Sequence, residues 1–315
     1  MYKRYFILVV VALLFGCTSR PEEPLRIGSN SWPGYEPLYI ARDKGFYDGT
    51  KIQLVALPSA SDVLAALRSG NLEGAALTLD ESLTLLEDNI DLKVVLIMDF
   101  SDGGDVLLAK PGIDSISDLK GKTVALETTA VGAILLDGAL TSANVSIDDI
   151  TIQNCMVDKH LQCYEHVDAI VTFEPALTRL RELGAKLLFD SSQIPGRIVD
   201  VLVVSEMALK KQEGLVKKLI AGYFQARQLL DESPLETAES ISPRLGLAPQ
   251  QILDSFEGLK LPSLSENYQY LDEHNGAMKA IVKELSTLMV DKALLSREIK
   301  KTDIVTSQFL PAVNH

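Results

Sequence analysis

The sequence is poor in residue types that catalytic and nucleic-acid-binding proteins commonly use. Its 315 residues include three cysteines, four histidines and one tryptophan. Three cysteines are too few for a disulfide-based scaffold. Acidic residues outnumber basic ones by 43 to 30, which gives a formal net charge of −13. A broad nucleic-acid-binding surface is therefore disfavoured, because phosphate contacts need clustered lysine and arginine.

Familiar catalytic motifs are also lacking. The sequence contains no Gly-x-Ser-x-Gly elbow, P-loop, dinucleotide fingerprint or HExxH pair. We therefore expect a protein that is not an enzyme and needs no cofactor. A nucleophile–histidine–acid set can still assemble in space, so spacing alone leaves that alternative open. His160, Cys163 and His166 recur every three residues on a predicted helix, but a solvated helix face explains them better than a metal site.

Long apolar runs are confined to the first sixteen residues, which read as an export signal. Lys3 and Arg4 precede an apolar segment that is too short for a transmembrane helix. Leu14-Phe15-Gly16-Cys17 then resembles a bacterial lipobox, although Phe15 replaces the usual small residue. The resemblance implies a signal peptide over 1–16, acylation of Cys17 and a tether over 17–24; an uncleaved anchor is the alternative. Because residue 18 is Thr and not Asp, the lipoprotein rule favours a periplasmic location at the outer membrane over the inner one.

The remaining chain alternates short β-prone runs with helical segments. This order is typical of a doubly wound α/β fold. After Ser205 the pattern is helical only, and we expect those helices to cover the first α/β unit. The predicted strands cover residues 25–28, 51–57, 74–78, 92–98, 105–110, 123–127, 150–153, 168–172, 186–189 and 198–204.

Several segments resemble one family of solute-binding proteins. Ser29–Tyr47 (SNSWPGYEPLYIARDKGFY), Ala65–Leu77, Ser115–Glu127 and Val167–Pro175 are similar in order and spacing to binding proteins of the nitrate, taurine, alkanesulfonate and thiamine-precursor type. Together with Val199–Ser205 they span roughly residues 25–205. The resemblance implies a two-lobed periplasmic-binding-protein fold of type II that closes on a small ligand. Lobe one would comprise 25–104 and 205–315, with the helical C-terminal segment packed on it, and lobe two would comprise 105–204.

The same resemblance indicates the partners. A monomeric, lipid-anchored binding protein would deliver its ligand to an ABC permease and ATPase. A ligand-sensing lipoprotein that reports to a membrane receptor is the alternative. A relative of the thiamine-pyrimidine synthases is a remote third reading, which the export signal disfavours.

Ligands of open α/β sheets bind beyond the carboxyl ends of the strands, and this rule selects the candidate binding residues. Trp32 and Tyr35 would form cleft walls, and Thr128 and Thr129 would offer donors where a helix begins. The full set is Ser31, Trp32, Tyr35, Thr78, Asp80, Asp102, Asp105, Glu127, Thr128, Thr129, Glu174 and Asp200.

Half of these candidates are acids, whereas the same segments contain no Arg or Lys. The local chemistry therefore favours a small polar ligand with an amine, or a zwitterion, over an anion. Arg197 is the nearest group of opposite charge. Cys155 and Cys163 remain after acylation of Cys17, and in an oxidising compartment such an even pair is a candidate disulfide, with two buried thiols as the alternative.

Overall fold

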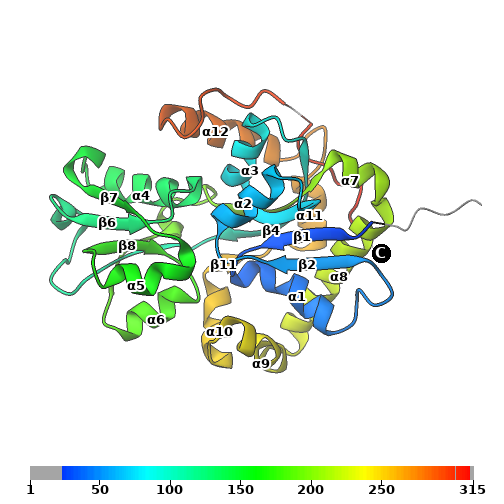
Figure 1. Cartoon of the computed structure of the whole chain (residues 1–315), viewed down its shortest axis with the longest axis horizontal. Coiled ribbons are helices and arrows are strands. Elements are labelled where there is room, and N and C mark those ends of the chain that lie inside the picture. The colour runs from blue at the N-terminus through cyan, green and yellow to red at the C-terminus, as the bar shows by residue number, and fades with distance from the viewer. Residues whose placement is uncertain (1–22, 302, 313–315) are drawn as a thin grey trace, which may run out of the picture.

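Two separate β-sheets organise the chain (Figure 1). The computed structural model describes residues 23–301 and 303–312, so the predicted signal, Cys17 and most of the tether lie outside the described residues. A six-stranded sheet has the order β11-β4-β10-β3-β1-β2, and a five-stranded sheet has the order β7-β6-β8-β5-β9. We call the parts built on them the first and the second unit.

The strands of the first unit are β1 (Leu25–Ser29), β2 (Ile52–Ala56), β3 (Gly74–Thr78), β4 (Leu92–Ser101), β10 (Val199–Ser205) and β11 (Leu259–Lys260). Those of the second unit are β5 (Val106–Ala109), β6 (Thr123–Leu126), β7 (Thr151–Asn154), β8 (Ala169–Thr172) and β9 (Lys186–Asp190). Ten of these eleven strands overlap a strand that the sequence predicts. The exception, β11, is two residues long and lies where only helices are expected.

Both sheets contain parallel and antiparallel strand pairs, and in the first sheet the antiparallel pairs include those of β10. Strands β1, β2 and β3 are parallel, as helical crossovers require. Strand β10 enters from the second unit and runs antiparallel between β3 and β4, with Val201 opposite Leu77 and Ile97. The prediction that lobe two extends to residue 204 is therefore wrong. The second unit ends before β10, because the chain has rejoined the first sheet at Val199.

Helices cover the sheets of both units. The first unit carries α1 (Glu36–Asp43), α2 (Ala60–Arg68) and α3 (Leu79–Glu87), and the second carries α4 (Ala130–Ser142), α5 (His160–Tyr164) and α6 (Ala176–Glu182). The C-terminal segment adds α7 (Glu206–Lys211), α8 (Glu213–Glu232), α9 (Pro234–Leu245), α10 (Pro249–Glu257), α11 (Leu264–Tyr270) and α12 (Met278–Asp291). Over the residues that the structure describes, no helix is both long and apolar enough to span a membrane.

Buried polar contacts attach the C-terminal helices to the first unit, as the sequence predicts. Arg244 of α9 donates to both carboxyl oxygens of the fully buried Glu36, at 2.8 and 3.0 Å, and lies over the ring of Tyr39. Burial raises the pKa of Glu36 to about 7, although Arg244 opposes the shift. Tyr223 of α8 donates to the Met98 carbonyl of β4 at 3.1 Å.

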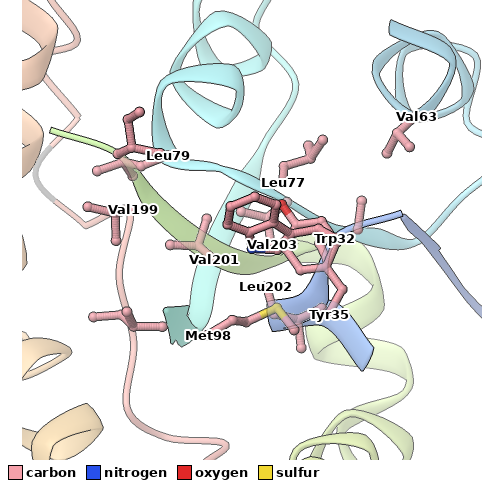
Figure 2. Packing of buried hydrophobic residues seen from close by; sticks show 14 of the residues in the cluster. Trp32, Tyr35, Val63, Leu77, Leu79, Met98, Val199, Val201, Leu202 and Val203 are labelled. Atoms are coloured by element: carbon pink, nitrogen blue, oxygen red, sulfur yellow. The ribbon is translucent and has the colours of Figure 1, made fainter. Parts of the chain in front are cut away.

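The apolar core surrounds β10, whose residues from Val199 to Val204 are at most 2% exposed. Figure 2 shows Trp32 and Tyr35 beside Leu202 and Val203, on the loop that follows β1. Both aromatic side chains belong to the core cluster and also reach the end of the sheet. The core of the first unit thus positions aromatic groups at the junction with the second unit.

The chain crosses between the units twice, and the two crossings lie side by side. Residues 102–105 connect β4 to β5, and residues 191–198 connect β9 to β10. The hydroxyl groups of Ser101 and Ser191 lie 2.7 Å apart, and Gly103 N–H donates to Ser191 Oγ at 2.8 Å.

Candidate functional site

A cavity lies at the junction of the two units and is lined by residues from both. It contains about 520 Å³ of space free of protein atoms, part of it open to solvent. The first unit contributes Asn30, Trp32, Tyr35, Ala60, Thr78, Glu81 and Asp200. The second unit and the first crossing contribute Asp105, Glu127, Thr129, Val131, Gly132, His160, Val171 and Phe173.

Two aromatic side chains meet across this junction. The rings of Trp32 and Phe173 pack edge to face with centroids 5.3 Å apart. Trp32 Nε1 also donates to the carboxyl group of Asp99, at 3.1 Å to the nearer oxygen. Trp32 is therefore both a core residue and a cavity wall, since it is 4% exposed and still lines the cavity.

Asp99 and Asp200 form a buried carboxyl pair below the aromatic wall. They are cross-strand neighbours on β4 and β10, and Tyr35 donates its hydroxyl proton to Asp200 at 2.5 Å. Burial raises the pKa of both carboxyl groups, and the negative charges of Asp99 and Asp105 raise the pKa of Asp200 further. Burial also raises the pKa of the Tyr35 hydroxyl. The pair thus favours sharing a proton over carrying two charges.

A second pair of acids starts helix α3. Asp80 and Glu81 are at most 2% exposed, and burial raises the pKa of each carboxyl group. Glu81 Oε2 accepts the Thr78 N–H at 3.2 Å, whereas Glu81 Oε1 has no hydrogen-bond partner among the described residues. Burial likewise raises the pKa of Asp105, to about 6.

Glu127 connects the two units across the cavity. Its Oε1 accepts the N–H and the hydroxyl of Ser61, at 2.8 and 2.5 Å, in the first turn of α2. Its Oε2 is buried and has no hydrogen-bond partner within the described part of the chain. One oxygen thus binds the first unit, while the other is left without a partner in a residue that lines the cavity.

His160 lines the wall formed by the second unit. Its Nδ1 lies 2.8 Å from the Thr172 hydroxyl, and its Nε2 is buried with no partner among the residues described. Burial lowers the pKa of the imidazole to about 4, so the ring is neutral at pH 7. The expected solvated face is therefore wrong for His160, which is 2% exposed.

A disulfide bond joins Cys155 and Cys163 on either side of His160, with the Cα atoms 6.5 Å apart. Cys155 N–H donates to the Leu126 carbonyl at 2.8 Å and so attaches this loop to β6. The bridge therefore fixes the short helix α5, which carries His160, against the sheet.

Seven of the twelve predicted binding residues line the cavity: Trp32, Tyr35, Thr78, Asp105, Glu127, Thr129 and Asp200. The other five lie elsewhere. Ser31 is half-buried outside the cavity lining, and Asp80 is buried behind it. Asp102 forms an ion pair with Lys260 at 2.8 Å. Thr128 is exposed, and its N–H donates to Asn154. Glu174 accepts hydrogen bonds from the N–H and the hydroxyl of Thr178.

Sequence reasoning did not select Ala60, Glu81 and His160 as site residues. Ala60 is the first residue of α2 and Glu81 is the third residue of α3, so the strand-end rule stops just short of them. His160 reaches the cavity from α5, and only its burial reveals that role. Arg197, the nearest basic residue in sequence, is exposed and does not line the cavity.

The arrangement is suited to holding a molecule through buried polar groups. Within the described ranges, no three His, Cys, Asp or Glu side chains are grouped to hold a metal ion. The described cavity lining contains no Cys, Ser or Lys, the side chains that act most often as nucleophiles.

Comparison with known proteins shows the family and the fold. The family model described as "NMT1/THI5 like" matches residues 32–237, whereas no curated protein sequence matches the chain significantly. The periplasmic aliphatic sulphonate binding protein SsuA from Escherichia coli superposes with a TM-score of 0.73 at 18% identity, covering 91% of this chain and 99% of that one.

Two further structures are similar over nearly their whole lengths. The zinc-bound ligand binding component of an ABC-type import system from Staphylococcus aureus has a TM-score of 0.75 at 13% identity, covering 91% and 98% of the two chains. The desulfurization enzyme DSZB has a TM-score of 0.66 at 15% identity, covering 91% and 97%. The chain has the two-lobed fold of periplasmic binding proteins, and it belongs to the NMT1/THI5-like family.

Proposed function

We propose that this protein is the extracytoplasmic solute-binding component of an ABC importer and captures a small organic molecule between its two units. The observation that carries the proposal is the cavity, because residues of both units line it and the backbone passes between those units at two adjacent crossings. A ligand bound there contacts both units and so favours their closure. Glu127 supports the same mechanism, since its carboxyl group spans the junction.

The cellular location is part of the proposal. The lipobox-like Leu14–Cys17 supports acylation of Cys17 and anchoring at the periplasmic face of a membrane, with the outer membrane favoured by Thr18. The Cys155–Cys163 bridge supports an oxidising compartment, since disulfides persist outside the cytoplasm. Labelling with a palmitate analogue should mark the full chain and leave a Cys17→Ser variant unmarked.

Binding without chemistry is the activity that the cavity supports best. The desulfurization enzyme DSZB has the same fold, so the fold alone does not decide between binding and catalysis. In this chain the basic side chain at the cavity is His160, whose Nδ1 is already bonded to Thr172. Because no cysteine or serine lines the cavity, a covalent intermediate lacks its usual nucleophile.

Native mass spectrometry of the full chain, purified from the envelope of its host, tests this function. A bound small molecule should accompany the wild-type protein and be lost on denaturation without any change in its own mass. A Trp32→Ala/Glu127→Gln variant of wild-type fold should lose it. Absence of any bound molecule, together with no thermal stabilisation by small organic compounds, would argue against solute binding. Conversion of the molecule into a product would point to an enzyme.

A further inference from the structure

The cavity has an electrostatic polarity that indicates the chemical class of its ligand. We infer that the ligand is an organic ammonium ion, whose charged group binds between the first unit and Glu127. This inference deepens the proposed function, because it assumes that the cavity binds a solute. It is carried by four lining acids, by the unpartnered oxygens among them and by the lack of lysine and arginine in the cavity lining.

Four carboxyl groups line the same cavity, two from the first unit, one from the first crossing and one from the second unit. Glu81 follows β3, Asp200 lies on β10, Asp105 ends the first crossing, and Glu127 follows β6. Each of the four residues is at most 6% exposed. Carboxyl groups brought together in this way repel one another when ionised, unless a cation lies between them.

Unpartnered oxygen atoms mark where donors belong. Glu81 Oε1 and Glu127 Oε2 are buried and accept no hydrogen bond from any described residue. The Thr129 hydroxyl group, which also belongs to the cavity lining, is likewise without a partner within the described chain. A buried acceptor without a donor destabilises a protein by about 1–3 kcal/mol, so such atoms are normally found where a ligand or water completes them. An ammonium group offers several N–H donors at one point.

Among the described residues, no lysine or arginine lines the cavity. Arg244, outside the lining, donates to Glu36 through Nε and keeps one guanidinium nitrogen without a partner in the described chain, and Lys260 pairs with Asp102. The acids are also not grouped to coordinate a metal ion in the described residues. The remaining charge partner is therefore a ligand with its own cation.

Aromatic and neutral groups complete the binding site. Trp32, Tyr35 and Phe173 line the cavity, and aromatic faces attract ammonium ions. The opposite wall carries the neutral imidazole of His160, with Nε2 free to bond an uncharged polar group. The ligand thus has a cationic end toward Glu81 and Asp200 and a less charged end toward His160.

Three benzyl compounds test the charge: benzylammonium is a cation, benzyl alcohol is a neutral molecule of nearly the same shape, and phenylmethanesulfonate is an anion with a larger head group. The single tryptophan, Trp32, lies in the cavity wall, so its fluorescence reports binding directly. Benzylammonium should bind at least 10-fold more tightly than either of the others. The same purified protein should carry a native ligand that mass spectrometry identifies as a cation at pH 7.

Variants separate the cavity from general electrostatic attraction. Glu81→Gln should weaken benzylammonium binding about 10-fold, the scale of one charged hydrogen bond. Asp102→Asn removes an acid outside the cavity and should leave binding unchanged. Tighter binding of phenylmethanesulfonate, or an anionic native ligand, would overturn the ammonium assignment while leaving solute binding intact. Failure of every probe together with absence of a native ligand would overturn the assignment and the proposed function together.

Discussion

Replacing Asp105 by Asn should stabilise the ligand-free protein and weaken its ligand binding. Asp105 lines the cavity, is 4% exposed, and has a pKa that burial raises from 3.8 to about 6. A shift of about two units corresponds to about 3 kcal/mol of differential stability. Asn resembles the neutral acid in shape and cannot ionise, so it avoids this cost.

The pH dependence follows from the direction of the shift. Because the pKa is higher in the folded protein, the stability tied to the neutral acid is present below pH 3.8 and is lost as pH rises toward 6. The advantage of Asp105→Asn should therefore be about 1 kcal/mol at pH 4.5 and about 3 kcal/mol at pH 7.5. The charge of Asp105 is also one cause of the raised pKa values of Asp80, Asp99 and Asp200, so removing it should lower those pKa values and add to the stabilisation at high pH.

Urea unfolding of ligand-free protein between pH 4.5 and 8 measures this difference. Asp102→Asn is the matched control, because Asp102 lies three residues earlier and forms a partly exposed pair with Lys260. Its effect should be at most about 1 kcal/mol, and destabilising. Benzylammonium affinity of Asp105→Asn should fall while its stability rises. The reasoning would be refuted by a variant that is no more stable than wild type at pH 7.5, or by a stability difference from wild type that is the same at every pH.

Three further perturbations test separate parts of the site. Trp32→Ala removes an aromatic wall and should weaken ligand binding about 10-fold or more by calorimetry; unchanged affinity in a folded variant would exclude Trp32 from the site. Glu127→Gln keeps an acceptor for Ser61 but loses the charge, so affinity for benzylammonium should fall about 10-fold while small-angle scattering still shows the closed form. An open form would contradict the assignment of the Ser61 bond to an uncharged acceptor. Unchanged affinity would contradict the assignment of ligand binding to the charge of Glu127. A Cys155→Ser/Cys163→Ser variant should lose roughly 2–3 kcal/mol of unfolding free energy in urea, the scale expected for closing a short loop; equal stability would show that the bridge does not brace the second unit.

The alternation of apolar runs and caps was enough to predict the sheets and the strand ends where ligand groups gather. Trp32 and Glu127 were found by that rule because they follow strands β1 and β6 of the two sheets. Asp200 lies near the start of β10, and it reaches the same edge because β10 runs antiparallel to β3 and β4. The rule could not separate Asp105 from Asp102, since three residues of irregular backbone turn one side chain into the cavity and the other toward Lys260.

Features that depend on long-range packing were beyond the sequence. His160 has an exposed-looking position on a short helix, and its burial arises from the sheet and loop that surround it. The bond between Ser61 and Glu127 joins residues 66 positions apart on different units. The antiparallel pairing of β10 with both β3 and β4 likewise joins residues that are far apart in the sequence.

The two adjacent crossings limit how the units can move. A single linker would let one unit swivel freely, whereas two backbone strands fixed at Ser101 and Ser191 leave essentially one axis of rotation. Opening would then follow the same arc whichever molecule occupies the cavity. Substitutions at the cavity wall can therefore change which solute is held without changing the outer shape presented by the closed protein, so selection for a new ligand need not disturb recognition by a membrane partner.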